Sequence, residues 1–232
     1  EGVHFAFPFN VPGGKVRIGN AWSHYQTESG QMPGSNKNFF SVNRWADVSN
    51  DTCGVTFITL DAPLLEIGDI TCDPIEVGYI DTLEQSQTLL SYPMNNYWET
   101  NYKAGQAGKT SFRYALYPHH GFDPLLAEKR GIEQHQPLIP VVTDMFMSIG
   151  KPYFKTIVSE EVIIESMIPL KGKGIVVRLY NPAEKAVVLQ IDNEDGRRNV
   201  YLCDPYGADL KPLDDELVID SGEVLHLLRE DR

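Results

Sequence analysis

Short segments in which apolar and polar residues alternate recur along most of the chain. Such alternation is typical of β-strands that bury one face. In the first half it predicts strands over 3–9, 39–48, 54–60 and 110–117. Asp51 and Gly54 separate two of these strands in the manner of a turn.

One segment of the first half has helical character instead. The stretch 123–134 begins with Asp123, a favourable N-cap, followed by Pro124 at the first helical position. Leu125, Leu126 and Ile132 are expected to form its apolar face, and Gly131 lowers its helix propensity.

The second half reads as strands at regular spacing, separated by turn residues such as Lys171–Gly174 and Asn193–Gly196. The expected strands are 154–158, 162–168, 174–180, 186–191, 199–203, 217–219 and 224–228. Short strands at this density are typical of a small β-sandwich. We therefore expect an all-β chain of two domains, 1–147 and 148–232.

Composition and charge narrow the classes of function. The 232 residues include 20 Lys and Arg against 32 Asp and Glu, a net charge of −12. A chain this acidic lacks the general attraction to phosphate backbones and anionic lipids. We expect neither a nucleic-acid partner nor a membrane partner.

The candidate catalytic motifs are weak. Gly108-Lys109-Thr110 resembles the end of a phosphate-binding loop, but the required earlier glycine is Lys103 and a strand-like segment follows. His119-His120 lacks the further ligands that a metal site needs. No nucleophile motif is present. The sequence thus predicts no catalytic residue and no metal ligand in this chain.

Three cysteines, Cys53, Cys72 and Cys203, form no C-x-x-C pair. We expect them to be small buried apolar side chains. A disulfide between Cys53 and Cys72 is the alternative.

Aromatic rings and amides concentrate in the segment 91–103. Rings can cover the apolar face of a sugar while amides bind its hydroxyls, yet the same mixture also suits a strand edge with its loop. The candidate carbohydrate-binding residues are Asn95, Asn96, Trp98 and Asn101, then Arg44.

Several segments resemble, in order, the carboxy-terminal β region of family 38 glycoside hydrolases, the α-mannosidase-like enzymes, in their bacterial form. They are Phe5–Gly14, Asn43–Ser49, Gly54–Thr56, Leu60–Leu64, Met94–Tyr102, Phe112–Leu116 and Pro118–His119. The terminal segment containing Arg178–Pro182 is similar more loosely.

The resemblance implies a large antiparallel sandwich, similar to the galactose-mutarotase-like supersandwich, followed by a small sandwich. The large sandwich is expected to be incomplete at its amino end. It implies a parent enzyme that hydrolyses α-mannosides with retention. The zinc and the nucleophilic Asp of such enzymes belong to an amino-terminal barrel, on which this region would pack. This chain would then hold no cofactor and would be inactive alone.

Three classes of function stay open: an inactive part of a glycosidase, a freestanding carbohydrate-binding module, and a purely structural β-sandwich protein.

Overall fold

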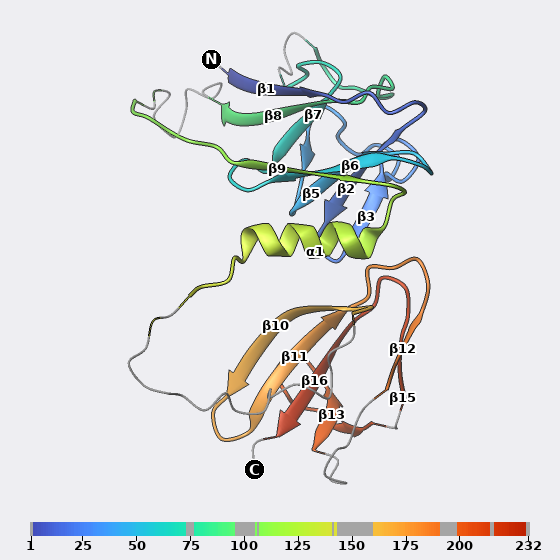
Figure 1. The fold of residues 1–232 in the computed structure, drawn as a ribbon, viewed down its shortest axis with the longest axis vertical. Coiled ribbons are helices and arrows are strands. Elements are labelled where there is room, and N and C mark those ends of the chain that lie inside the picture. The colour runs from blue at the N-terminus through green and yellow to red at the C-terminus, as the bar shows by residue number, and fades with distance from the viewer. Residues whose placement is uncertain are drawn as a thin grey trace. The chain divides into compact units, whose positions relative to one another are not determined.

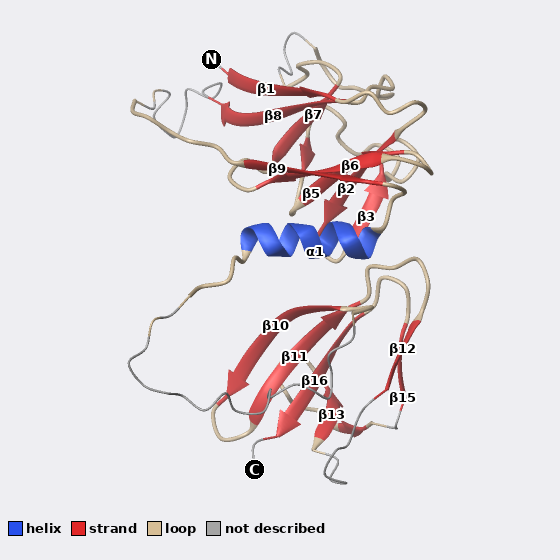
Figure 2. Ribbon diagram, viewed as in Figure 1, coloured by secondary structure: helices blue, strands red, loops and turns tan. Residues whose placement is uncertain are grey.

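The computed structural model describes residues 2–72, 77–95, 105, 107–140, 142, 160–190, 199–213 and 216–230. The chain divides into two units, Glu1–Pro137 and Leu138–Arg232. Paired strands in both units are antiparallel, and the described residues contain a single helix, which confirms the all-β class (Figures 1 and 2).

The described residues of the first unit form two sheets. One has the order β1 (Gly2–Pro8), β8 (Thr88–Asn95), β7 (Leu64–Ile67), β4 (Phe40–Ser41). The other has the order β3 (Ser23–Gln26), β2 (Lys15–Asn20), β5 (Trp45–Ser49), β6 (Gly54–Thr59), β9 (Tyr114–His119). Their facing side chains form one apolar core, with Phe40, Leu65 and Leu89 from the first sheet and Ile18, Val48 and Phe57 from the second.

Helix α1 (Pro124–His135) covers the other face of the five-stranded sheet. Asp123 caps it as predicted, because its side chain accepts hydrogen bonds from the backbone N–H groups of Leu125 and Leu126. Among the described residues, no helix has the length and apolar character needed to cross a membrane.

The predicted apolar face of this helix is wrong. Its buried residues are Pro124, Ala127, Glu128 and Gly131, whereas Leu126 is exposed. A Cβ at Gly131 would lie 2.9 Å from the Cβ of Arg44. The helix approaches the sheet so closely that small residues, rather than leucines, occupy the contact.

The predicted strand 39–48 is two strands. The segment leaves the four-stranded sheet after β4 and enters the five-stranded sheet at β5. Between them, the N–H of Val42 donates to the carbonyl of Pro63 and the N–H of Asn43 to that of Gly19. An alternating pattern cannot show that a strand changes sheets.

Strand β9 begins four residues later than predicted, at Tyr114. The N–H of Arg113 donates to the Asp61 carboxylate instead of a strand partner. The Gly108-Lys109-Thr110 segment lies in the loop before β9, so the element that comes next is a strand and not a helix.

The second unit is also built of packed antiparallel sheets. One sheet has the strand order β10 (Ile163–Leu170), β11 (Gly174–Tyr180), β16 (Val224–Glu230), β13 (Val200–Cys203), β14 (Lys211–Pro212). In a second sheet, β12 (Val187–Gln190) pairs with β15 (Glu216–Ile219). Val177, Leu227 and Ile219 belong to the apolar core between the two sheets. The predicted strand at 154–158 lies outside the described residues.

The prediction of buried cysteines is wrong. Cys53 is exposed, Cys72 and Cys203 are half-buried, and all three are free thiols. Burial raises the pKa of the Cys72 and Cys203 thiols.

The cap of α1 gives the first prediction. We expect Asp123→Ala to lower the free energy of unfolding of the first unit by about 1 kcal/mol, because two backbone donors lose their acceptor. Urea titration followed by tryptophan fluorescence measures it, since all three tryptophans lie before residue 137. Asp81→Ala, at an exposed position, is the control; an equal effect there would contradict the capping role.

Candidate functional site

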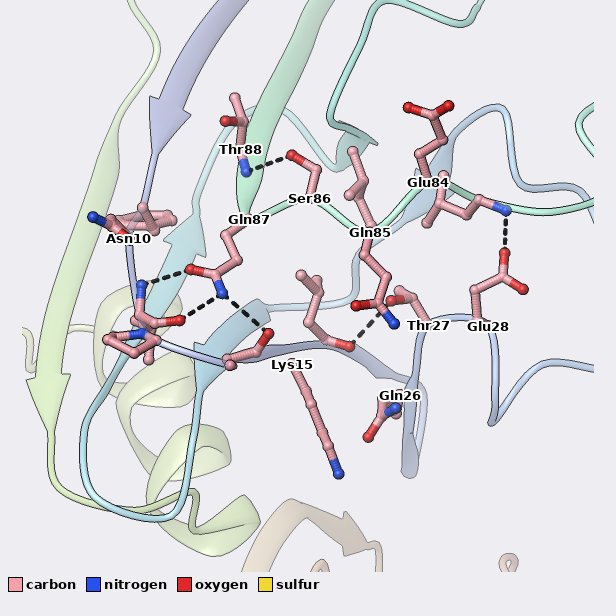
Figure 3. Close-up of a pocket in the computed structure, with 18 of the residues that line it drawn as sticks. Asn10, Lys15, Gln26, Thr27, Glu28, Glu84, Gln85, Ser86, Gln87 and Thr88 are labelled. Atoms are coloured by element: carbon pink, nitrogen blue, oxygen red, sulfur yellow. Dashed lines mark hydrogen bonds between the residues drawn. The ribbon is translucent and has the colours of Figure 1, made fainter.

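A pocket of about 760 Å³ opens beside the turn between β1 and β2 (Figure 3). Its lining comes from three separate segments: 9–16, 26–29 and 83–88, together with Ile67. The volume is within the range of small-molecule sites.

Gln87 holds two of these segments together. Its Oε1 accepts from the N–H of Val11 at 2.6 Å, and its Nε2 donates to the carbonyls of Val11 and Gly14 at 2.6 and 3.1 Å (Figure 3). One side chain thereby satisfies three backbone groups in the β1–β2 turn. The pocket wall depends on this amide.

The charged residues that line the pocket are Lys15, Glu28 and Glu84 among the described residues. Lys37 donates to Glu28 at 2.9 Å and lowers the pKa of that carboxyl, and the N–H of Leu83 also donates to Glu28. Glu28 is therefore held as a carboxylate with its oxygens occupied. A glycosidase needs a second carboxyl that can donate a proton, and the described lining offers only Glu84 besides Glu28.

The remaining polar lining includes the amides of Asn10, Gln26 and Gln85 and the amine of Lys15 (Figure 3). Phe9 is the one aromatic residue among the described lining, and its ring packs on Phe57 in the core. The pocket thus has hydrogen-bonding groups without a free ring for a sugar face. Of the sequence-predicted sugar residues, Arg44 is not among the described lining.

Arg44 lies immediately before β5 and is committed to a structural contact. Its Nη1 donates to Oε2 of Glu128 on α1 at 3.1 Å. The two side chains are 16% and 2% exposed. The structure therefore uses Arg44 to hold the helix on the sheet.

The other four candidates lie at or beyond the end of β8. Asn95 is the last residue of that strand, and Asn96, Trp98 and Asn101 lie outside the described residues. The aromatic- and amide-rich segment 91–103 starts inside the protein, because Ser91 and Tyr92 are buried.

His119 is also engaged within the fold. Its Nε2 lies 2.7 Å from Oδ2 of buried Asp47, and its Nδ1 lies 3.0 Å from the carbonyl oxygen of Gly121. Asp47 further accepts from the hydroxyls of Thr56 and Ser49. Both ring nitrogens of His119 therefore have an oxygen atom of the protein within hydrogen-bond distance.

Comparison with known proteins finds a similar fold among solved structures but no match in sequence. The chain matches no model of a known protein family, and no curated protein is similar to it in sequence. Its fold is similar to a solved structure described as an alpha-mannosidase from Enterococcus faecalis V583, with a TM-score of 0.65 and 11% identity. The similarity covers 99% of this chain and 26% of that chain, so this chain spans about a quarter of its structural relative.

Sequence reasoning missed the pocket. Many of its lining residues are Gly, Pro, Asn, Gln and Ser, which are common in loops, and they come from positions up to 79 apart in the sequence. The turn Pro12-Gly13-Gly14 and the polar run Gln85-Ser86-Gln87 were the available signals. Nothing in either shows that the two segments meet.

The role of Gln87 can be measured. We expect Gln87→Ala to lower the free energy of unfolding of the first unit by about 2 kcal/mol, because three half-buried backbone groups lose their partner. Urea titration detects the change. Gln85→Ala removes the same side chain from an exposed position and should stay within about 0.5 kcal/mol; parity between the two variants would rule out the anchoring role.

The role of Arg44 is tested in the same way. We expect Arg44→Ala to cost about 3 kcal/mol, because it removes the cation beside a carboxylate buried under the helix. Arg130→Ala is the control, since Arg130 pairs with Glu133 on the helix surface and should cost no more than about 1 kcal/mol. A fully stable Arg44 variant would argue against the structural role and return Arg44 to the list of sugar contacts.

Proposed function

We propose that the chain is the carboxy-terminal, non-catalytic β region of an α-mannosidase-like glycoside hydrolase. The observation that carries the proposal is the fold similarity to an alpha-mannosidase over 99% of this chain and only 26% of that one. The ordered series of segments that resemble family 38 enzymes supports the finer assignment.

In this proposal the chemistry belongs to another part of the parent enzyme. There, a carboxylate attacks the anomeric carbon, a second carboxyl group assists departure and hydrolysis, and the configuration is retained. Zinc would assist in that part. The occupied carboxylate of Glu28 in the described pocket is in keeping with a supporting role for this chain.

The region would act as a scaffold that packs on the catalytic barrel and contributes to the rim of the carbohydrate site. Its contact with Glu128 makes Arg44 a positioning residue for the sheet and helix. Asn95, Asn96, Trp98 and Asn101 are the remaining candidates for contact with the α-mannoside.

Two measurements on the 232-residue chain test the proposal. With zinc added, we expect no turnover of an aryl α-mannoside, because the chain would lack the nucleophile and the acid. We also expect no saturable heat on calorimetric titration with mannose oligosaccharides, because a rim alone binds weakly. Turnover would contradict the non-catalytic role, and saturable binding would favour a freestanding carbohydrate-binding module.

A third test addresses the parent. The coding sequence upstream of the Glu1 codon should encode an Asp- and His-rich barrel of several hundred residues.

In the full-length protein, Trp98→Ala should raise KM for mannosides if the 91–103 segment lines the rim. Tyr206→Ala, at an 81% exposed aromatic residue of the second unit, is the control. An upstream gene without such a barrel would overturn the proposal, and unchanged kinetics in the Trp98 variant would remove the best rim candidate.

A further inference from the structure

Three side chains of types that can ligate a metal ion meet at the four-stranded sheet of the first unit. His4 is in β1, Glu66 in β7, and Cys72 in the segment that follows β7. One ligand atom of each, an imidazole nitrogen, a carboxylate oxygen and the Cys72 Sγ, lies within 4.8 Å of the other two. We call these residues the His4–Glu66–Cys72 cluster.

The cluster lies on the face of the sheet that points away from the apolar core. Leu65 and Ile67 of β7 belong to that core, so Glu66 between them points to the opposite face. The face is nevertheless buried there, with His4 and Glu66 side chains 9% and 0% exposed.

Hydrogen bonds with Asn38 fix Thr71, the residue before Cys72. The Asn38 side-chain amide donates to the carbonyls of Thr71 and Gly78, both at 2.8 Å, and the Thr71 hydroxyl donates to the Asn38 carbonyl. These bonds hold Thr71, and therefore its neighbour Cys72, against the sheet.

Two of the three side chains are oriented by a second contact. The His4 ring stacks on Tyr92, with the centroids 4.5 Å apart and the planes 5° from parallel. Oε2 of Glu66 accepts from the Thr71 N–H at 2.8 Å, which leaves Oε1 directed at His4. Metal ligands in proteins are commonly held by such outer contacts.

The spacing within the cluster differs from that of the other histidine–carboxylate contact in the same unit. Nε2 of His119 lies 2.7 Å from Oδ2 of Asp47, a short hydrogen-bond distance. Nε2 of His4 lies 3.3 Å from Oε1 of Glu66, which is a long hydrogen-bond distance. Two ligands with metal bonds of roughly 2.0–2.1 Å at a tetrahedral angle are separated by about 3.3 Å.

We propose that His4, Glu66 and Cys72 bind a divalent transition-metal ion of the zinc type, with water at the fourth position. The combination of nitrogen, oxygen and sulfur donors suits zinc and disfavours magnesium and calcium, which prefer oxygen ligands. When the metal–sulfur bond forms, the Cys72 proton passes to solvent. The ion links β1, β7 and the segment after β7, a role independent of the proposed function.

Cobalt(II) is the probe, because its spectrum reports tetrahedral geometry and thiolate ligation. The 232-residue chain is prepared reduced and metal-free as Cys53→Ser, which removes the exposed thiol. Titration with CoCl₂ should give one equivalent of bound metal, intense visible d–d bands and a sulfur-to-cobalt charge-transfer band. Added ZnSO₄ should bleach these bands.

Two variants on this background separate the cluster from other thiols. Adding Cys72→Ser should abolish the charge-transfer band and weaken binding tenfold or more, whereas adding Cys203→Ser should leave both unchanged. Absence of the bands in the Cys53→Ser chain, or their persistence without Cys72, would overturn the proposal.

A measurement on the unmodified chain covers the case in which the Cys72 variant does not fold. Zn²⁺ should slow iodoacetamide labelling of Cys72 but not of Cys53 or Cys203, as read by peptide mass spectrometry. Equal labelling of Cys72 with and without Zn²⁺ would also overturn the site.

Discussion

Strand β5 is buried on both faces, and much of the first unit follows from this. All five of its residues, Trp45–Ser49, are buried. Ala46 and Val48 face the core between the two sheets, so Trp45, Asp47 and Ser49 face the helix side. That second face must supply both apolar cover for the indole and hydrogen-bond partners for a buried carboxylate.

Both requirements are met by residues distant in sequence. Asp47 is surrounded by His119, Thr56 and Ser49, and the Arg17 guanidinium donates to Ser49 at 3.0 Å. Trp45 fits because Gly19 has no side chain. A Cβ at Gly19 would lie 2.6 Å from the indole ring. Burying a carboxylate without partners would be costly. The hydrogen bonds to Asp47 therefore allow this face of the sheet to be covered by a helix.

Histidine–carboxylate contacts occur twice in this unit with different consequences. At His119 both ring nitrogens have close oxygen partners, so the ring completes a closed structural network. At His4 the contact with Glu66 is longer and a thiol lies close by. Burial is similar at the two places, and it is the spacing and the third side chain that distinguish a structural pair from a proposed metal site.

Local sequence determined the elements whose stabilising contacts are local. The Asp123 cap and the helix after it were predictable, as was strand 174–180, because capping and alternation act over a few residues. The all-β class followed from the same patterns. Only the tertiary structure decided where the chain changes sheets at 42–44, that Gly131 belongs at a close helix–sheet contact, and that Arg44 binds Glu128. It alone brought together Gln87 with Val11, and His4 with Glu66 and Cys72, across 62 to 76 positions of sequence. The physical reason is that hydrophobic patterning specifies which face of a strand is buried, whereas the partner that a buried polar group meets depends on which strands become neighbours.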